Sequence, residues 1–230
     1  MTLKIKYMES FPRWALNELG ASESMIDYLQ HYVERVMKYA VGSFDWEVTT
    51  HVDVKIQKGA TFRMRRGTLK GVYGLHKVPC QHVTYGVNRS GIDADDIKGR
   101  LRGKTTIVIN IGSAYYHKYV RAIEAGVSET TAMNSLRGEL AETIFHEMAH
   151  SHQYDVGHLS NSKSNGVWYH NWCGWKSLNI RNLSYESYRA LPWEVEARLK
   201  AKTLCVGFGR HIKIHNMKTL SYNDLQKLLK

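Results

Sequence analysis

The sequence predicts an α+β fold, because patterns typical of helices and patterns typical of strands occupy different stretches of the chain. Residues 22–37 begin with a serine cap and carry apolar residues three and four apart, which predicts an amphipathic helix. Residues 46–56 alternate between apolar and polar, which predicts a strand with one buried face. A third pattern, again after a serine cap, predicts a long helix over residues 128–154.

Shorter patterns predict the remaining elements and their order. We expect strands at 61–66, 70–76, 80–87 and 104–111, and helices at 114–125, 192–204 and near 222–229. Residues 155–180 are rich in Gly, Asn, Ser, His and Trp without a period, which predicts an ordered loop or short irregular elements over a site. The alternation in His211–His215 predicts a strand. The resulting order is helix, strands, long helix, loop and later helix.

Length and composition limit the class of protein. At 230 residues with 43% hydrophobic residues and three prolines, the chain is expected to fold as one domain over residues 1–230, with a core at about 22–205 and a basic extension at 206–230. No apolar run approaches the roughly 18–20 residues that span a bilayer, and the first residues lack the apolar core of a signal peptide, so we expect no membrane contact and a cytoplasmic location. Cys80, Cys173 and Cys205 form no Cys-x-x-Cys pair, which predicts reduced structural thiols.

The net charge of +11 is concentrated in two segments. Residues 55–104 contain 12 basic and 3 acidic residues, and residues 198–230 contain 8 basic and 1 acidic residue. Such segments could neutralise phosphates, so nucleic acid is a candidate partner, although basic loops are more often simply solvated. The candidate contacts are Arg63, Arg65, Arg66, Lys70, Arg100 and Arg102.

The stretch His146-Glu147-Met148-Ala149-His150 is the candidate catalytic motif. Two histidines four apart on a helix project from the same side, so both rings can reach one Zn²⁺ ion. Glu147 lies one step round the helix, where it can act as the general base toward a zinc-activated water. The apolar stripe of this helix lies almost opposite the histidines, which favours a polar cleft over the alternative of two incidental surface histidines.

A third protein ligand is expected downstream, on the helix that begins at Pro192. Glu194 borders the apolar stripe of this helix, whereas Glu196 shares a side with Lys200, so periodicity favours Glu194 as the ligand. The alternative is that both glutamates only interact with the helix dipole.

The pentapeptide followed by Glu-Val-Glu-Ala resembles the zincin metallopeptidases of the gluzincin type. The resemblance implies a His146, His150 and Glu194 zinc site, an N-terminal helix and a mostly antiparallel sheet packed on the long motif helix, and a C-terminal helix that carries the third ligand. It also implies hydrolysis of peptide bonds in a protein or peptide substrate. That reaction requires an oxyanion donor, for which Tyr154, Tyr169 and His170 are the candidates, although aromatic residues in such a loop more often serve packing. This chain has an arginine four residues after Glu194, where that family often has an acid.

A second similarity is to the SprT-like proteases, whose third ligand is a histidine after the motif helix. His170, in His-Asn-Trp-Cys-Gly-Trp, is the matching position, and residues 66–74 and 105–111 are similar to the strands before the motif in that family. The zinc ribbon common in its members is absent from this sequence. The similarity implies a protease that acts on DNA-bound proteins. A third hypothesis is a zincin-like module that binds nucleic acid or protein without catalysis.

Overall fold

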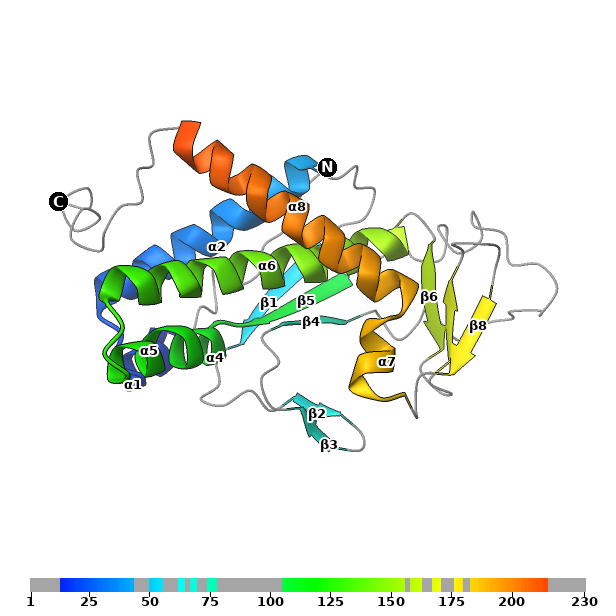
Figure 1. The fold of residues 1–230 in the computed structure, drawn as a ribbon, viewed down its shortest axis with the longest axis horizontal. Coiled ribbons are helices and arrows are strands. Elements are labelled where there is room, and N and C mark those ends of the chain that lie inside the picture. The colour runs from blue at the N-terminus through cyan, green and yellow to red at the C-terminus, as the bar shows by residue number, and fades with distance from the viewer. Residues whose placement is uncertain are drawn as a thin grey trace.

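The computed structural model describes residues 13–43, 50–55, 62–64, 67–69, 74–77, 105–155, 158–162, 167–170, 176–179 and 183–214 (Figure 1). The helical elements are α1 (Arg13–Glu18), α2 (Glu23–Ser43), α4 (Ile111–Tyr115), the π-helical segment η3 (Tyr116–Val120), α5 (Arg121–Glu124), α6 (Glu129–Asp155), α7 (Tyr185–Arg189) and α8 (Pro192–Ile214). The strands are β1 (Thr50–Lys55), β2 (Phe62–Met64), β3 (Gly67–Leu69), β4 (Gly74–Lys77), β5 (Thr105–Asn110), β6 (Leu159–Ser162), β7 (Val167–His170) and β8 (Lys176–Asn179).

Helix α6 lies at the centre of the structure, between α2, α8 and the sheet that contains β5 (Figure 1). Its apolar side is fully buried, with Leu136, Ile144 and Phe145 each 0% exposed. The core cluster joins this side of α6 to the buried residues of α2 and to the aromatic Phe208 on α8. The expected apolar stripe therefore anchors α6 and fixes the direction of its polar side.

The sheet beside α6 has the strand order β1-β5-β4. Strand β1 runs parallel to β5, from Thr50 opposite Thr105 to Lys55 opposite Asn110, and β4 runs antiparallel to β5. The prediction of an α+β fold with a mostly antiparallel sheet on the motif helix is wrong, because helices make up most of the described residues and the longest pairing in this sheet is parallel. Alternation along one strand reveals its buried face but not the direction of its neighbour.

Two further groups of strands are antiparallel. Strands β2 and β3 pair with each other, and β6, β7 and β8 form a three-stranded sheet in that order. The prediction of an ordered loop or short irregular elements over residues 155–180 is wrong in part, since these last three strands lie within it. Each strand has only four residues, which is too short for a period of two to stand out from loop composition.

Helix α8 is longer than the sequence pattern indicated. It continues through Gly207 and Gly209 to Ile214, so the predicted end at residue 204 and the predicted strand at His211–His215 are both wrong for the described residues. The extension is stabilised by Phe208, whose ring is 3% exposed and lies 5.4 Å from the ring of Tyr39 and 5.9 Å from that of Phe145. Tertiary packing thus overrides the low helix propensity of the two glycines.

Side-chain caps and one glycine set several helix boundaries. The Ser22 and Ser128 hydroxyls accept hydrogen bonds from the backbone N–H groups three residues later, at the starts of α2 and α6. Gly126 has a φ of +79°, which ends α5 and separates it from α6. The single helix predicted over 114–125 is instead three consecutive segments, α4, η3 and α5, with a π-helical turn in the middle.

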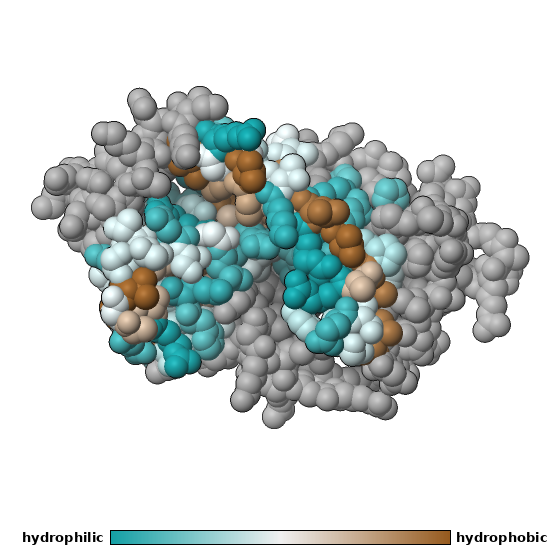
Figure 2. All heavy atoms as spheres, in the orientation of Figure 1, coloured by the Kyte–Doolittle hydropathy of each residue, from teal (hydrophilic) through white to brown (hydrophobic). Residues whose placement is uncertain are grey.

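The surface of α8 alternates between apolar and hydrophilic side chains, as Figure 2 shows. Its exposed apolar residues are Val195, Leu199 and Val206. Among the described residues, no helix combines the length and the apolar character needed to cross a membrane.

Candidate metal centre

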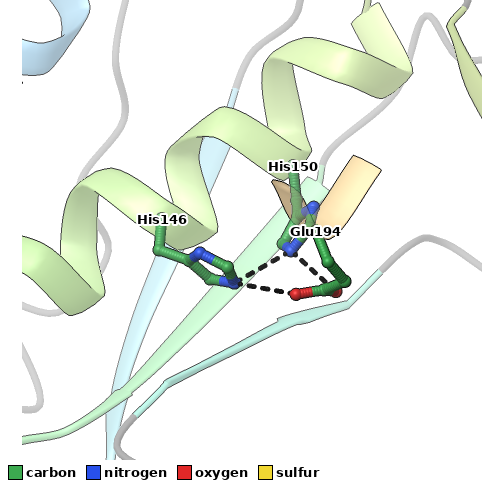
Figure 3. A group of neighbouring side chains, drawn as sticks. All are labelled: His146, His150 and Glu194. Atoms are coloured by element: carbon green, nitrogen blue, oxygen red, sulfur yellow. Dashed lines mark hydrogen bonds and ion pairs between the residues drawn. The ribbon is translucent and has the colours of Figure 1, made fainter. Parts of the chain in front are cut away.

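Three side chains from two helices converge beneath α6 (Figure 3). His146 and His150 project from α6, and Glu194 reaches them from the first turn of α8. The Nε2 atoms of the two histidines are 3.1 Å apart. The Glu194 carboxylate places Oε1 3.3 Å from Nε2 of His150 and Oε2 3.5 Å from Nε2 of His146. This group could hold a metal ion, because one ligand atom from each residue lies within 4.8 Å of the ligand atoms of the other two.

The local sequence explains why the group forms. The spacing of four residues places the two imidazoles one turn apart on one side of α6, with their ring centroids 4.6 Å apart. On α8, Trp193 and Ala197 are 0% exposed and hold the first turn of the helix against the interior. Glu194, which borders this buried stripe on the wheel, is 4% exposed and is directed at the histidines rather than at solvent.

Burial and charge act in opposite directions on these groups. Burial alone raises the pKa of Glu194, but hydrogen bonds to His146 and His150 outweigh it and leave the pKa of this carboxyl well below its usual range. Burial alone lowers the pKa of His150, but the hydrogen bond and the charge of Glu194, followed by the charge of Glu147, raise the pKa of this imidazole above its ordinary value. The site therefore favours an anionic Glu194 next to positive charge, whether from a proton or from a metal ion.

Glu147 is 8% exposed and follows His146 on α6. It is not one of the three converging ligands, yet its charge is close enough to His150 to raise the pKa of that imidazole. Glu147 thus lies close enough to His150 to act on its charge without being one of the three candidate ligands.

Gln153 is a site residue whose role the sequence did not reveal. It is 0% exposed, and its Oε1 lies 2.9 Å from Nδ1 of His150. Its Nε2 donates to the backbone carbonyl of Trp193 at 2.9 Å and to Oε2 of Glu196 at 3.1 Å. Gln153 lies on the same side of α6 as the two histidines, but its partners on α8 lie 40 and 43 residues away in the sequence.

Two neighbouring residues of α8 take other partners. Glu196 forms an ion pair with Lys200 at 2.7 Å, in agreement with the shared side that periodicity indicated. Arg198, at the position where gluzincins often have an acid, donates to the backbone carbonyl of Arg189. The polar contacts behind the candidate ligands therefore come from Gln153 and Glu196.

Several predicted residues are only partly described or lie outside the described residues. His170 and Tyr169 belong to β7, Tyr154 to α6 and Arg63 to β2, but their side chains are outside the described part. The same holds for the whole of Arg65, Arg66, Lys70, Arg100, Arg102, Cys80 and Cys173. The alternative third ligand, the oxyanion donors and the nucleic-acid contacts therefore stay predictions. Cys205 is described and is a free thiol, partly buried on α8.

In comparisons with known proteins, no family model, curated protein or solved structure matches this chain. The similarity to gluzincins and to SprT-like proteases therefore depends on the motif residues themselves. What those residues do must be inferred from the geometry of the His146, His150 and Glu194 group.

Proposed function

We propose that this protein is a zinc-dependent metallopeptidase in which His146, His150 and Glu194 hold the ion and Glu147 is the general base. The observation that carries the proposal is the convergence of two imidazole nitrogens and one carboxylate within 3.1–3.5 Å of one another. A buried, hydrogen-bonded group of this kind is costly to maintain as mere packing, because polar groups lose hydration when they are buried.

The donor set supports zinc over the harder cations. Imidazole nitrogen suits zinc and other transition metals, whereas Mg²⁺ and Ca²⁺ prefer all-oxygen sites. For a tetrahedral ion with ligand bonds of about 2.0–2.1 Å, the ligand atoms are separated by about 3.3 Å. The Nε2–Nε2 separation of 3.1 Å is close to that value, and the two Glu194 oxygens lie 3.3 Å from Nε2 of His150 and 3.5 Å from Nε2 of His146. Three protein ligands also leave a fourth position open, which is typical of catalytic rather than structural zinc sites.

The residues of the chain divide the chemistry between them. When bound, zinc supplies a Lewis acid that polarises a carbonyl and makes water a better nucleophile near neutral pH. The Glu147 carboxylate accepts the proton from the attacking water and passes it to the amine of the departing peptide. The negative charge of Glu194 and the rigid anchoring of α6 on its apolar side keep the two imidazoles in place during this transfer.

The test of this proposal is a comparison of Glu147→Gln with the wild-type protein. Gln has nearly the same shape but cannot accept the proton, so zinc content should stay the same while cleavage of a mixed peptide library, followed by mass spectrometry, falls by roughly 10²–10⁴-fold. Glu129→Gln is the matched control, because it removes the same charge from an exposed position at the start of α6. Unchanged cleavage by a zinc-loaded Glu147→Gln variant would dismiss the proposed role of this residue.

A further inference from the structure

Gln153 connects the two helices that carry the candidate metal ligands. It lies on α6, three residues after His150, and its amide bonds to Trp193 and Glu196 on α8. Trp193 precedes Glu194, so one buried amide contacts a candidate ligand on α6 and the backbone beside a candidate ligand on α8. The side chain of Gln153 has no exposed surface, which removes water as a competing partner.

The partners of Gln153 determine which way its amide faces. A backbone carbonyl can only accept a hydrogen bond, so the NH₂ group must be the part that faces Trp193 at 2.9 Å. The second hydrogen of that NH₂ group is directed to Oε2 of Glu196, whose other oxygen is paired with Lys200. The amide oxygen is therefore left for His150, and Gln153 has no hydrogen to donate to that ring.

This orientation fixes the proton of His150. Because the Gln153 oxygen can only accept, Nδ1 of His150 must carry the hydrogen that bridges their 2.9 Å separation. The lone pair of the neutral ring then lies on Nε2, the atom that faces His146 and Glu194. A histidine ligand is productive in this tautomer alone, since metal binding through Nε2 requires a free lone pair there.

We propose that Gln153 is a positioning residue that fixes the tautomer and ring orientation of His150 and holds the first turn of α8 at the metal site. The inference rests on the metal site of the proposed function, and it identifies the hydrogen-bonded support behind that site. Glu196 and Lys200 extend the support, because their 2.7 Å ion pair holds the acceptor that orients the Gln153 amide. Partners of this kind typically change metal affinity by 10–100-fold when they are removed.

The experiment measures zinc affinity by competition with a chelator, together with thermal unfolding of the metal-free protein. Gln153→Met keeps the length of the side chain and removes its amide, so the zinc dissociation constant should rise by about 10–100-fold. Gln153→Asn, whose shorter amide cannot reach both helices, is a second variant that should show a loss in the same direction. Leu136→Val is the control, because it disturbs the buried side of α6 away from the ligands.

A rescue variant separates positioning from packing. In the double variant Gln153→Glu with Glu196→Gln, the new carboxylate can accept from His150 and from the new amide, but no group at position 153 donates to the Trp193 carbonyl. Zinc affinity should therefore recover only in part in the double variant, because the contact with Trp193 and the ion pair with Lys200 are lost. Gln153→Glu alone places two carboxylates together and should bind zinc more weakly than the double variant.

Three results would overturn the inference. They are zinc affinity within twofold of wild type in both Gln153→Met and Gln153→Asn, an equal loss of affinity in the Leu136→Val control, and no recovery in the double variant. Failure of the proposed function is distinguishable from these results, because the assay needs no substrate. A protein that binds zinc and depends on Gln153, yet cleaves no peptide, would retain the positioning role and lose the peptidase assignment.

Discussion

The contact between Gly207 on α8 and Tyr39 on α2 can be tested with a single methyl group. A Cβ atom added at Gly207 would lie 2.3 Å from the Tyr39 Oη atom and 3.5 Å from its Cζ atom. The second distance is an ordinary van der Waals contact, so the hydroxyl oxygen alone carries the conflict. Gly207→Ala therefore probes how closely the helix that carries Glu194 packs on α2.

The expected magnitude combines two opposing effects. Replacing glycine by alanine inside a helix stabilises it by about 1 kcal/mol, and overpacking of a well-packed contact costs about 1–3 kcal/mol. Gly207→Ala should therefore leave the free energy of unfolding unchanged or lower it by up to about 2 kcal/mol. In a Tyr39→Phe background the oxygen is absent, so the same substitution should stabilise by about 1 kcal/mol. The two substitutions should be coupled by about 1–3 kcal/mol.

Thermal and urea denaturation of the four proteins in this double-mutant cycle provide the measurement. For a chain of this size, 1 kcal/mol corresponds to a shift in Tm of about 2–4 °C. We expect Gly207→Ala to raise the Tm of Tyr39→Phe by about that amount and not to raise the Tm of wild type. Equal shifts in the two backgrounds would show that Gly207 and Tyr39 do not touch, and would refute the packing of α8 described above.

Two further predictions concern titrating groups. Burial, followed by the charge of Glu142, raises the pKa of Cys205 to about 11 from an ordinary 9.0. Iodoacetamide at pH 8 should therefore alkylate Cys205 roughly a hundredfold more slowly than an exposed thiol, as measured by peptide mapping. A rate equal to that of the exposed thiol would contradict this prediction. In the metal-free protein, the raised pKa of His150 contributes stability that is complete below pH 6.5 and is lost as the pH rises through the folded-state pKa. The lowered pKa of Glu194 contributes stability that is present above pH 4.5 and is lost toward acid. This pair therefore stabilises the fold most between pH 4.5 and 6.5. Zinc requires a neutral imidazole, so the increase in Tm caused by zinc should be larger at pH 8 than at pH 5.5, and an equal increase at the two values would count against His150 as a ligand.

The sequence predicted those features that depend on local spacing. The serine caps, the apolar side of α6 and the separation of His146 from His150 are all readable within a few residues. The period of one helix is also enough to favour Glu194, because it places this residue at the edge of the stripe that contains Trp193 and Ala197. The structure brings His146, His150 and Glu194 together at the candidate metal centre.

Features that depend on distant partners could not be predicted in this way. The parallel pairing of β1 with β5 joins residues 55 positions apart, and nothing in either strand specifies the direction of the other. Helix α8 continues past Gly207 because Phe208 packs on Tyr39 and Phe145, which a local helix-end signal at glycine cannot reveal. The role of Gln153 depends on a carbonyl and a carboxylate of another helix, which the sequence around it does not indicate.

The most direct test is the zinc content of the purified protein and of two single variants. Wild type should bind one zinc ion per chain, Glu194→Ala should lose most of it, and His170→Ala should keep it. The opposite order between the two variants would transfer the third ligand to His170 and favour the SprT-like alternative. A wild-type protein that contains no transition metal and takes up none when zinc is added would contradict the assignment of His146, His150 and Glu194 as a metal centre.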